Sequence, residues 1–185
     1  VRAGTIFDGE PEGSIVISFE PGLGQCLWVM RPEYASSKFL SQNMRKLASI
    51  SNVDRIQQAL QKEDSFLLKY LYTNPEQDWC YYYEKSDLAH QYEKWAEVVN
   101  LWKIAEQNGL QPENGFEYLP FIEAFAHSGD WETAKSMTRT SQKTMQGIEP
   151  LLCHIWSRLE SNTPDSAEKE GVILSVRDDL RCEQE

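Results

Sequence analysis

Residues 126–134, with the sequence AHSGDWETA, decide how the middle of this chain folds. Gly129 lies in a turn of small residues and is followed by Trp131 and Ala134. A second tryptophan, Trp95, lies 36 residues before Trp131 and also follows a helical segment that ends in polar residues. The order of small turn, aromatic residue and alanine therefore indicates a helix–turn–helix unit that occurs twice in the chain.

The linker between the two units, NGLQPEN at residues 108–114, supports this interpretation. Gly109 can end one helix, Pro112 cannot continue it, and Asn114 can cap the next. The interval of 36 residues is close to the ~34 residues of the tetratricopeptide repeat, which the units resemble. The sequence therefore predicts a mainly α fold of tetratricopeptide-like antiparallel helix pairs, an α-solenoid fragment, with helices at residues 78–92, 95–108, 116–127 and 131–146.

Pro120 lies inside the third predicted helix. A proline in a helix interior costs ~3 kcal/mol, but a proline in the first turn removes no hydrogen bond. We therefore expect this helix to begin near Glu117, or to kink there.

The flanking sequences are expected to cover the ends of the two units. Residues 14–19 and 26–30 are rich in β-forming side chains and are separated by EPGLGQ, which predicts a β-hairpin. Apolar residues from Met44 to Leu60 recur at spacings of three and four, as in an amphipathic helix that could cap one end, with a break allowed near Ser51-Asn52. EPLLCHIWSRLE predicts a capping helix at the other end.

The chain is thus divided into an N-terminal hairpin segment, a helical domain and a polar C-terminal tail with a short docking element, at residues 1–35, 36–160 and 161–185.

Charge and length exclude several classes of function. The chain has 29 acidic and 18 basic residues, a net charge of −11 that repels phosphate backbones, so no nucleic acid is expected as a partner. No apolar run approaches the ~20 residues that cross a bilayer. The four cysteines show no CxxC spacing, which disfavours a zinc knuckle and leaves two alternatives, buried free thiols or one long-range disulfide.

The predicted register brings polar side chains from two helices to the concave face of the helix pairs. We interpret this face as a groove that binds a peptide or protein partner without a cofactor or a metal. The residues expected to line it are Tyr83, Asp87, His90, Gln91, Glu123 and His127.

Two other interpretations remain open. Asp87, His90 and His127 could serve a small soluble enzyme or a metal-binding protein, because Asp87 and His90 lie at positions i and i+3 of one helix. The sequence contains no HExxH and no GxSxG motif, so the non-catalytic interpretation is favoured. The domain could also be a rigid spacer or an oligomerisation unit.

Several segments resemble the C-terminal soluble domain of multi-pass membrane proteins from cyanobacteria and related phyla. The segment WCYYYEKSDLA at residues 79–89 is similar to WCYYFEKADLA in that family, and PFIE at residues 120–123 and Cys153 with Trp156 also match. The resemblance covers residues 7–159. It departs from the family pattern at Ser86 and His90, and at Glu93-Lys94, where a Gly-Asp turn is expected.

The membrane part of that family resembles the lipid-phosphate-sugar-dependent glycosyltransferases. The resemblance implies that this chain is the extramembrane part of such a protein, next to a membrane-embedded portion of the same polypeptide. It also implies the extracytoplasmic face of a bacterial membrane, where a disulfide involving Cys26, Cys80 or Cys153 is expected. No catalytic residue is carried over to this domain.

Overall fold

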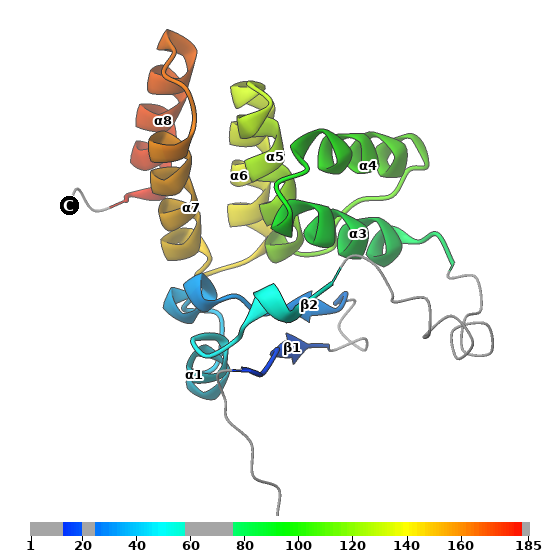
Figure 1. Cartoon of the computed structure of the whole chain (residues 1–185). Coiled ribbons are helices and arrows are strands. Elements are labelled where there is room, and N and C mark those ends of the chain that lie inside the picture. Colours follow the sequence, from blue (N-terminus) through cyan, green and yellow to red (C-terminus); the bar gives the residue numbers. More distant parts are fainter. Residues whose placement is uncertain (1–12, 20–24, 58–75, 183–185) are drawn as a thin grey trace, which may run out of the picture.

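The computed structural model describes residues 13–19, 25–57 and 76–182 (Figure 1). Within these ranges the chain is mainly helical, and its only sheet is a two-stranded antiparallel sheet near the N-terminus. The predicted mainly α class with a small N-terminal hairpin is therefore confirmed. None of the helices in the described ranges combines the length and the apolar character needed to cross a membrane.

Six helices form three successive pairs that stand side by side in Figure 1. The two helices of each pair pack against each other, and α4 also contacts α5. The pairs are α3 (Trp79–Gln91) with α4 (Trp95–Gln107), α5 (Leu119–His127) with α6 (Trp131–Thr144), and α7 (Glu149–Asn162) with α8 (Ala167–Leu180). All four helices predicted in the middle of the chain are present, as is the helix predicted after them.

The turns inside the first two pairs lie at equivalent positions. Gly129 has a φ of 83°, and Glu93, 36 residues earlier, has a φ of 55°. This left-handed conformation suits glycine and is strained for a residue with a side chain. After the second turn the Asp130 side chain accepts a hydrogen bond from Thr133 N at 3.1 Å and caps α6. Lys94 has no side-chain acceptor for this role, so the first pair has the less favourable turn.

A 3-10 turn, η6 (Gly115–Tyr118), precedes α5, so this helix begins slightly later than predicted. Pro120 lies in its first turn, as expected. Glycine is required at 115 because η6 approaches α6 closely: a Cβ there would lie 2.3 Å from the carbonyl oxygen of Ser141. The start of α5 is thus fixed by the contact between η6 and α6.

The N-terminal segment, residues 13–57 where described, lies below α3 and α7 in Figure 1. β1 (Ile17–Ser18) pairs with β2 (Trp28–Val29), with Ile17 opposite Val29. The rest of the segment contains the 3-10 helix η3 (Pro32–Ser36), the helix α1 (Gln42–Ala48) and the 3-10 turn η4 (Val53–Arg55). The sequence between the strands, residues 20–24, lies outside the described residues.

The apolar pattern that starts at Met44 does not continue as one helix: α1 ends at Ala48, just before the break that the sequence allows near Ser51-Asn52, and residues 58–60 lie outside the described residues. After α1 the chain is tied to the hairpin instead, because Asn52 N donates to Ser14 O at 2.8 Å and Val16 N donates to Ser51 Oγ at 3.0 Å. α1 packs against η3 and does not cap the helix pairs. The predicted boundary at residue 35 falls inside η3, and SFLLKYLY lies outside the described residues.

The docking element predicted in the C-terminal residues is a helix, α8, which is longer than predicted and leaves little of a polar tail within the described residues. α8 packs on α7 and α6. Its buried side chains recur at helical spacing: Val172, Ile173, Val176 and Leu180. Lys169 is 2% exposed, and its Nζ donates to the carbonyl oxygens of Glu160 and Thr163, both at 2.7 Å, at the end of α7. A disulfide between Cys153 and Cys182 fixes the end of α8 to α7.

Candidate functional site

The six residues predicted to line a groove come together on α3 and α5, but the N-terminal segment covers this side. Tyr83 is 1% exposed, Glu123 is 4% exposed, and Asp87 and His90 are each 8% exposed. Gln91 and His127 are partly buried. The interpretation of this face as an open groove is therefore wrong, and the space expected for a partner is filled by the chain itself.

Arg31, just after β2, binds Asp87 of α3. Its Nη2 lies 2.8 Å from Asp87 Oδ1 and 3.3 Å from the carbonyl oxygen of the same residue. Burial would lower the pKa of Arg31, but Tyr34 and Asp87 outweigh it and raise this pKa. Burial raises the pKa of the Tyr83 hydroxyl beside this pair, and the Asp87 charge raises it further. The charge of Asp87 is thus paired with the charge of Arg31 in the same chain.

Glu123 of α5 is the centre of a second buried ion cluster. Its Oε1 lies 2.6 Å from Arg158 Nη2 and 3.2 Å from His90 Nε2. Arg158 Nη1 also lies 3.4 Å from Glu33 Oε1 on η3. Burial alone would raise the pKa of Glu123, but His90 and Arg158 overcome this and lower it to about 2. The cluster joins α3, α5 and α7 to the N-terminal segment.

The remaining predicted residues also have internal partners. Gln91 Nε2 donates to Val53 O at 2.6 Å. The His127 ring is stacked on Trp95, with ring centroids 4.1 Å apart and planes at 2°. Burial lowers the pKa of His127, which favours the neutral ring. Asp87 and His127 are thus engaged separately, and the described residues contain no group of three His, Cys, Asp or Glu side chains placed to hold a metal ion.

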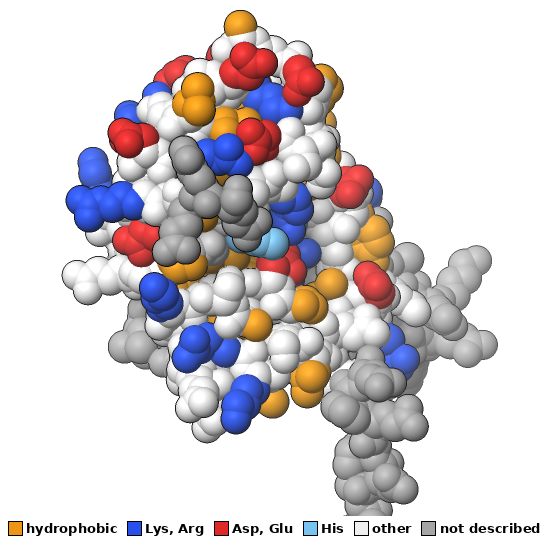
Figure 2. Space-filling view, turned by 90° about the vertical axis from the view of Figure 1, so that its left-hand side faces the viewer, with side chains coloured by type: hydrophobic (Ala, Val, Ile, Leu, Met, Phe, Trp, Pro, Cys, Tyr) orange, Lys and Arg blue, Asp and Glu red, His pale blue; other side chains and the backbone are white. Residues whose placement is uncertain are grey.

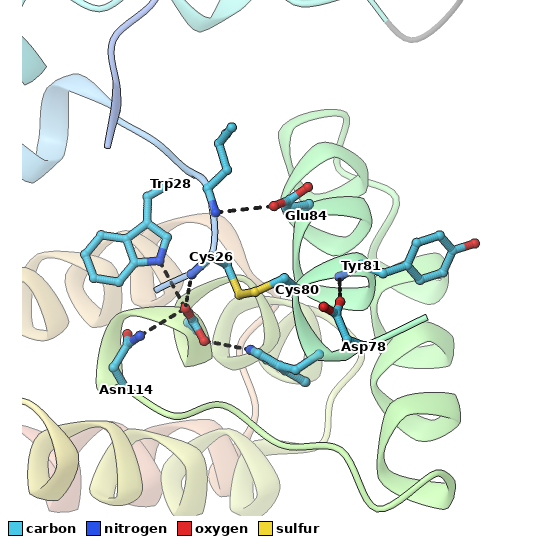
Figure 3. The surroundings of a disulfide bond; sticks show 10 residues. Cys26, Trp28, Asp78, Cys80, Tyr81, Glu84 and Asn114 are labelled. Carbon is cyan, nitrogen blue, oxygen red and sulfur yellow. Dashed lines mark hydrogen bonds between the residues drawn. A yellow bond between two sulfur atoms is a disulfide. The ribbon is translucent and has the colours of Figure 1, made fainter. Parts of the chain in front are cut away.

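A disulfide that the residue pattern did not assign fixes the N-terminal segment to the helix pairs (Figure 3). It joins Cys26, just before β2, to Cys80 in the first turn of α3. Glu84, one turn further along α3, accepts a hydrogen bond from Leu27 N at 3.3 Å. The four cysteines form two disulfides, so free thiols are wrong and a single disulfide is one too few, whereas the disulfide involving Cys26, Cys80 or Cys153 that the resemblance implies is present.

Glu117 lies beside this disulfide and is fully buried. Its Oε1 accepts hydrogen bonds from Cys26 N at 3.1 Å, Trp28 Nε1 at 3.2 Å and Asn114 Nδ2 at 2.9 Å. Its Oε2 accepts one from Trp79 Nε1 at 2.6 Å. A buried carboxylate is retained only where such donors replace water. Glu117 therefore connects the hairpin, the linker and α3, and sequence reasoning missed this role.

Outside the buried side that the N-terminal segment covers, the surface carries charges of both signs. Lys and Arg side chains alternate with Asp and Glu on much of the face in Figure 2, and hydrophobic side chains are scattered among them. Ion pairs join α8 to its neighbours: Arg139 of α6 lies 2.7 Å from Asp179, and Arg177 binds Glu160 of α7. In these two ion pairs each charged side chain has an opposite charge beside it.

A groove of about 670 Å³ lies between α4 and α6, away from the N-terminal segment. Its apolar lining is formed by Trp102, Leu110, Tyr118 and Met137. Glu106 and Glu132 also line it, and the described lining includes no Lys or Arg. No sequence pattern singled out these residues, because they are distributed over two helices, a linker and a 3-10 turn.

Comparisons with family models, with curated proteins and with solved structures gave no significant match for this chain.

Proposed function

We propose that this chain is a non-catalytic protein-interaction domain, the extramembrane C-terminal part of a multi-pass, glycosyltransferase-like membrane protein. The observation that carries the proposal is the pairing of all four cysteines in Cys26–Cys80 and Cys153–Cys182. Structural disulfides persist in oxidising compartments and are rare in the bacterial cytosol. This supports a position on the extracytoplasmic face of the membrane, as the resemblance of residues 7–159 implies.

The interaction role is supported by the way polar groups are distributed over the helix pairs. Asp87 and Glu123, which could have served acid–base chemistry, are bound to Arg31 and Arg158. The two disulfides and these ion pairs hold the N-terminal segment and α8 in place, which makes the pairs a rigid frame. A rigid frame with a groove between α4 and α6 that the described residues leave open is suited to holding a partner.

Location is tested by fractionating cells that contain the full-length native protein. Membranes are washed with carbonate, and free thiols are alkylated under denaturing conditions before and after reduction. We expect the protein to stay with the membrane until detergent is added, and its four cysteines to react only after reduction. Release by carbonate would contradict the membrane link, and alkylation without reduction would contradict the extracytoplasmic location.

The interaction role is tested by cross-linking in cells, followed by purification of the full-length protein in detergent. A version that ends before this domain is the control, since the membrane-embedded portion remains. We expect a cross-linked partner that is lost with the domain. An unchanged set of cross-links would favour a spacer, and a concentration-dependent dimer of the domain in light scattering would favour an oligomerisation unit.

A further inference from the structure

We infer that the groove between α4 and α6 binds a basic segment of a partner protein, with a lysine or arginine side chain on Trp102 between Glu106 and Glu132. This inference rests on the proposed interaction function and identifies its binding surface. It assigns the partner by chemistry: a cationic side chain flanked by apolar residues.

Trp102, which lines the groove, is packed against other aromatic rings. The Trp102 ring lies 4.9 Å from Phe121 and 5.9 Å from Trp79, the latter edge to face. Tyr118 also lines the groove; its ring centroid is 6.0 Å from that of Trp102, and the residue is only 8% exposed. A fixed indole face offers a cation a favourable site, because the negative face of the ring attracts positive charge. The ring need not be ordered again when a ligand binds.

The charge of the groove selects for a cation. Neither the Glu106 nor the Glu132 carboxylate has an ion pair or a hydrogen bond within the described part of the chain, in contrast to Asp87, Glu117 and Glu123. Glu106 also lies in the last turn of α4, where the helix dipole is unfavourable for a carboxylate. A cation between the two carboxylates would be stabilised by both and by the ring.

The remaining lining favours a protein segment over a small ammonium ion. Leu110 and Met137 extend the apolar surface beyond the aromatic rings, which suits the apolar neighbours of a cationic residue. Thr133 and Ser136 line the α6 side of the groove and could hydrogen-bond the backbone of an extended segment. A groove of about 670 Å³ is larger than a single ammonium group fills.

The test uses two synthetic peptides and the indole N–H signal of Trp102 in two-dimensional NMR at physiological salt. The first peptide alternates leucine with lysine, and the second has glutamate in place of lysine. We expect the lysine peptide to shift the Trp102 signal and the glutamate peptide to leave it unchanged. No shift with the lysine peptide, or the same shift with both, would overturn the inference.

Two variants separate the groove from the general negative charge of the chain. Glu106→Gln with Glu132→Gln removes two charges from the groove, and Glu168→Gln with Glu170→Gln removes two exposed charges from the first turn of α8. We expect at least a tenfold loss of affinity for the lysine peptide in the first variant and less than a twofold loss in the second. Equal losses would mean attraction by net charge alone and would overturn the inference.

Two further measurements fix the kind of ligand and the level at which the inference fails. If N-acetyl-lysine amide binds as tightly as the lysine peptide, the site takes a small cation and the assignment of a protein segment is wrong. The full-length Glu106→Gln, Glu132→Gln protein is also cross-linked in cells, where we expect the partner to be lost. A partner that is retained by this variant but lost with the whole domain would reject this groove and leave the interaction function standing.

Discussion

The side of the helix pairs under the N-terminal segment and the groove between α4 and α6 both contain carboxylates. They differ in burial and in whether the chain itself supplies a partner. Asp87, Glu117 and Glu123 are buried and bound to cations or hydrogen-bond donors of the same chain. Glu106 and Glu132 border an open groove and have no such partner within the described residues. A buried charge without a partner is costly, whereas an exposed one is solvated by water. The covered side therefore uses its charges for folding, and the open side keeps them available for a ligand.

Removing the disulfide that holds the covered side should have the largest effect. Cys26→Ala with Cys80→Ala opens a link between residues 54 positions apart, which would lower the free energy of unfolding by about 4 kcal/mol if chain entropy dominates. Urea unfolding of the oxidised proteins measures this loss. Amide hydrogen exchange separates the two disulfides: exchange in α3 should be faster in this variant, whereas the matched Cys153→Ala, Cys182→Ala variant should show faster exchange in α8 only. A loss below about 1 kcal/mol would mean that the disulfide is not needed to hold the segment.

Glu117→Gln tests whether the covered side depends on a charged acceptor. The amide would direct its N–H groups at one of the donors that now bind Glu117, so Trp79 Nε1 or the group of donors around Oε1 would lose its acceptor. We expect a loss of about 3 kcal/mol or more in urea unfolding, because a buried donor would remain unpaired. Glu113→Gln, in the exposed part of the linker just before η6, is the control and should change stability by less than about 0.5 kcal/mol.

The ion cluster around Glu123 should make stability depend on pH in the acid range. The pKa of Glu123 falls from 4.5 to about 2 on folding, so the folded state favours the charged form. This contribution is complete above pH 4.5 and is lost as the pH falls toward 2. A shift of this size corresponds to roughly 3 kcal/mol. Urea midpoints between pH 7 and pH 2 should fall for the native protein, and the fall should be shallower for Glu123→Gln, which is already destabilised at pH 7. Parallel curves for the two proteins would contradict this role.

The predictability of each region from sequence follows the same division. The helix pairs were predictable because their signals are local: Gly129, Trp131 and Ala134 mark a turn, and Gly109 with Pro112 ends a helix. Even the departure at Glu93 appears in the structure as a strained turn at the expected position.

The covered side was not predictable because its partners are distant in sequence. Arg31 meets Asp87 and Cys26 meets Cys80 only after the N-terminal segment has folded across α3. The helical register correctly placed Asp87, His90 and Glu123 on one side, but it contains no information about what covers that side. α8 was predicted only as a short docking element, because Gly171 and the exposed Leu174 obscure its helical periodicity and because the buried Lys169 reads as a surface residue.

The smallest effect on stability is expected where the inferred function lies. Glu132→Gln should lower the free energy of unfolding slightly, because Glu132 lies in the first turn of α6, where a carboxylate is favourable. Glu106→Gln should raise it slightly, because Glu106 lies in the last turn of α4. Each change should stay within about 0.5 kcal/mol in urea unfolding. If either variant lost as much stability as Glu117→Gln, these carboxylates would belong to the fold and not to a binding surface. A gain in stability for Glu106→Gln together with a loss of peptide binding would mean that the chain carries this carboxylate at a cost to its own helix, as expected of a residue that serves a partner.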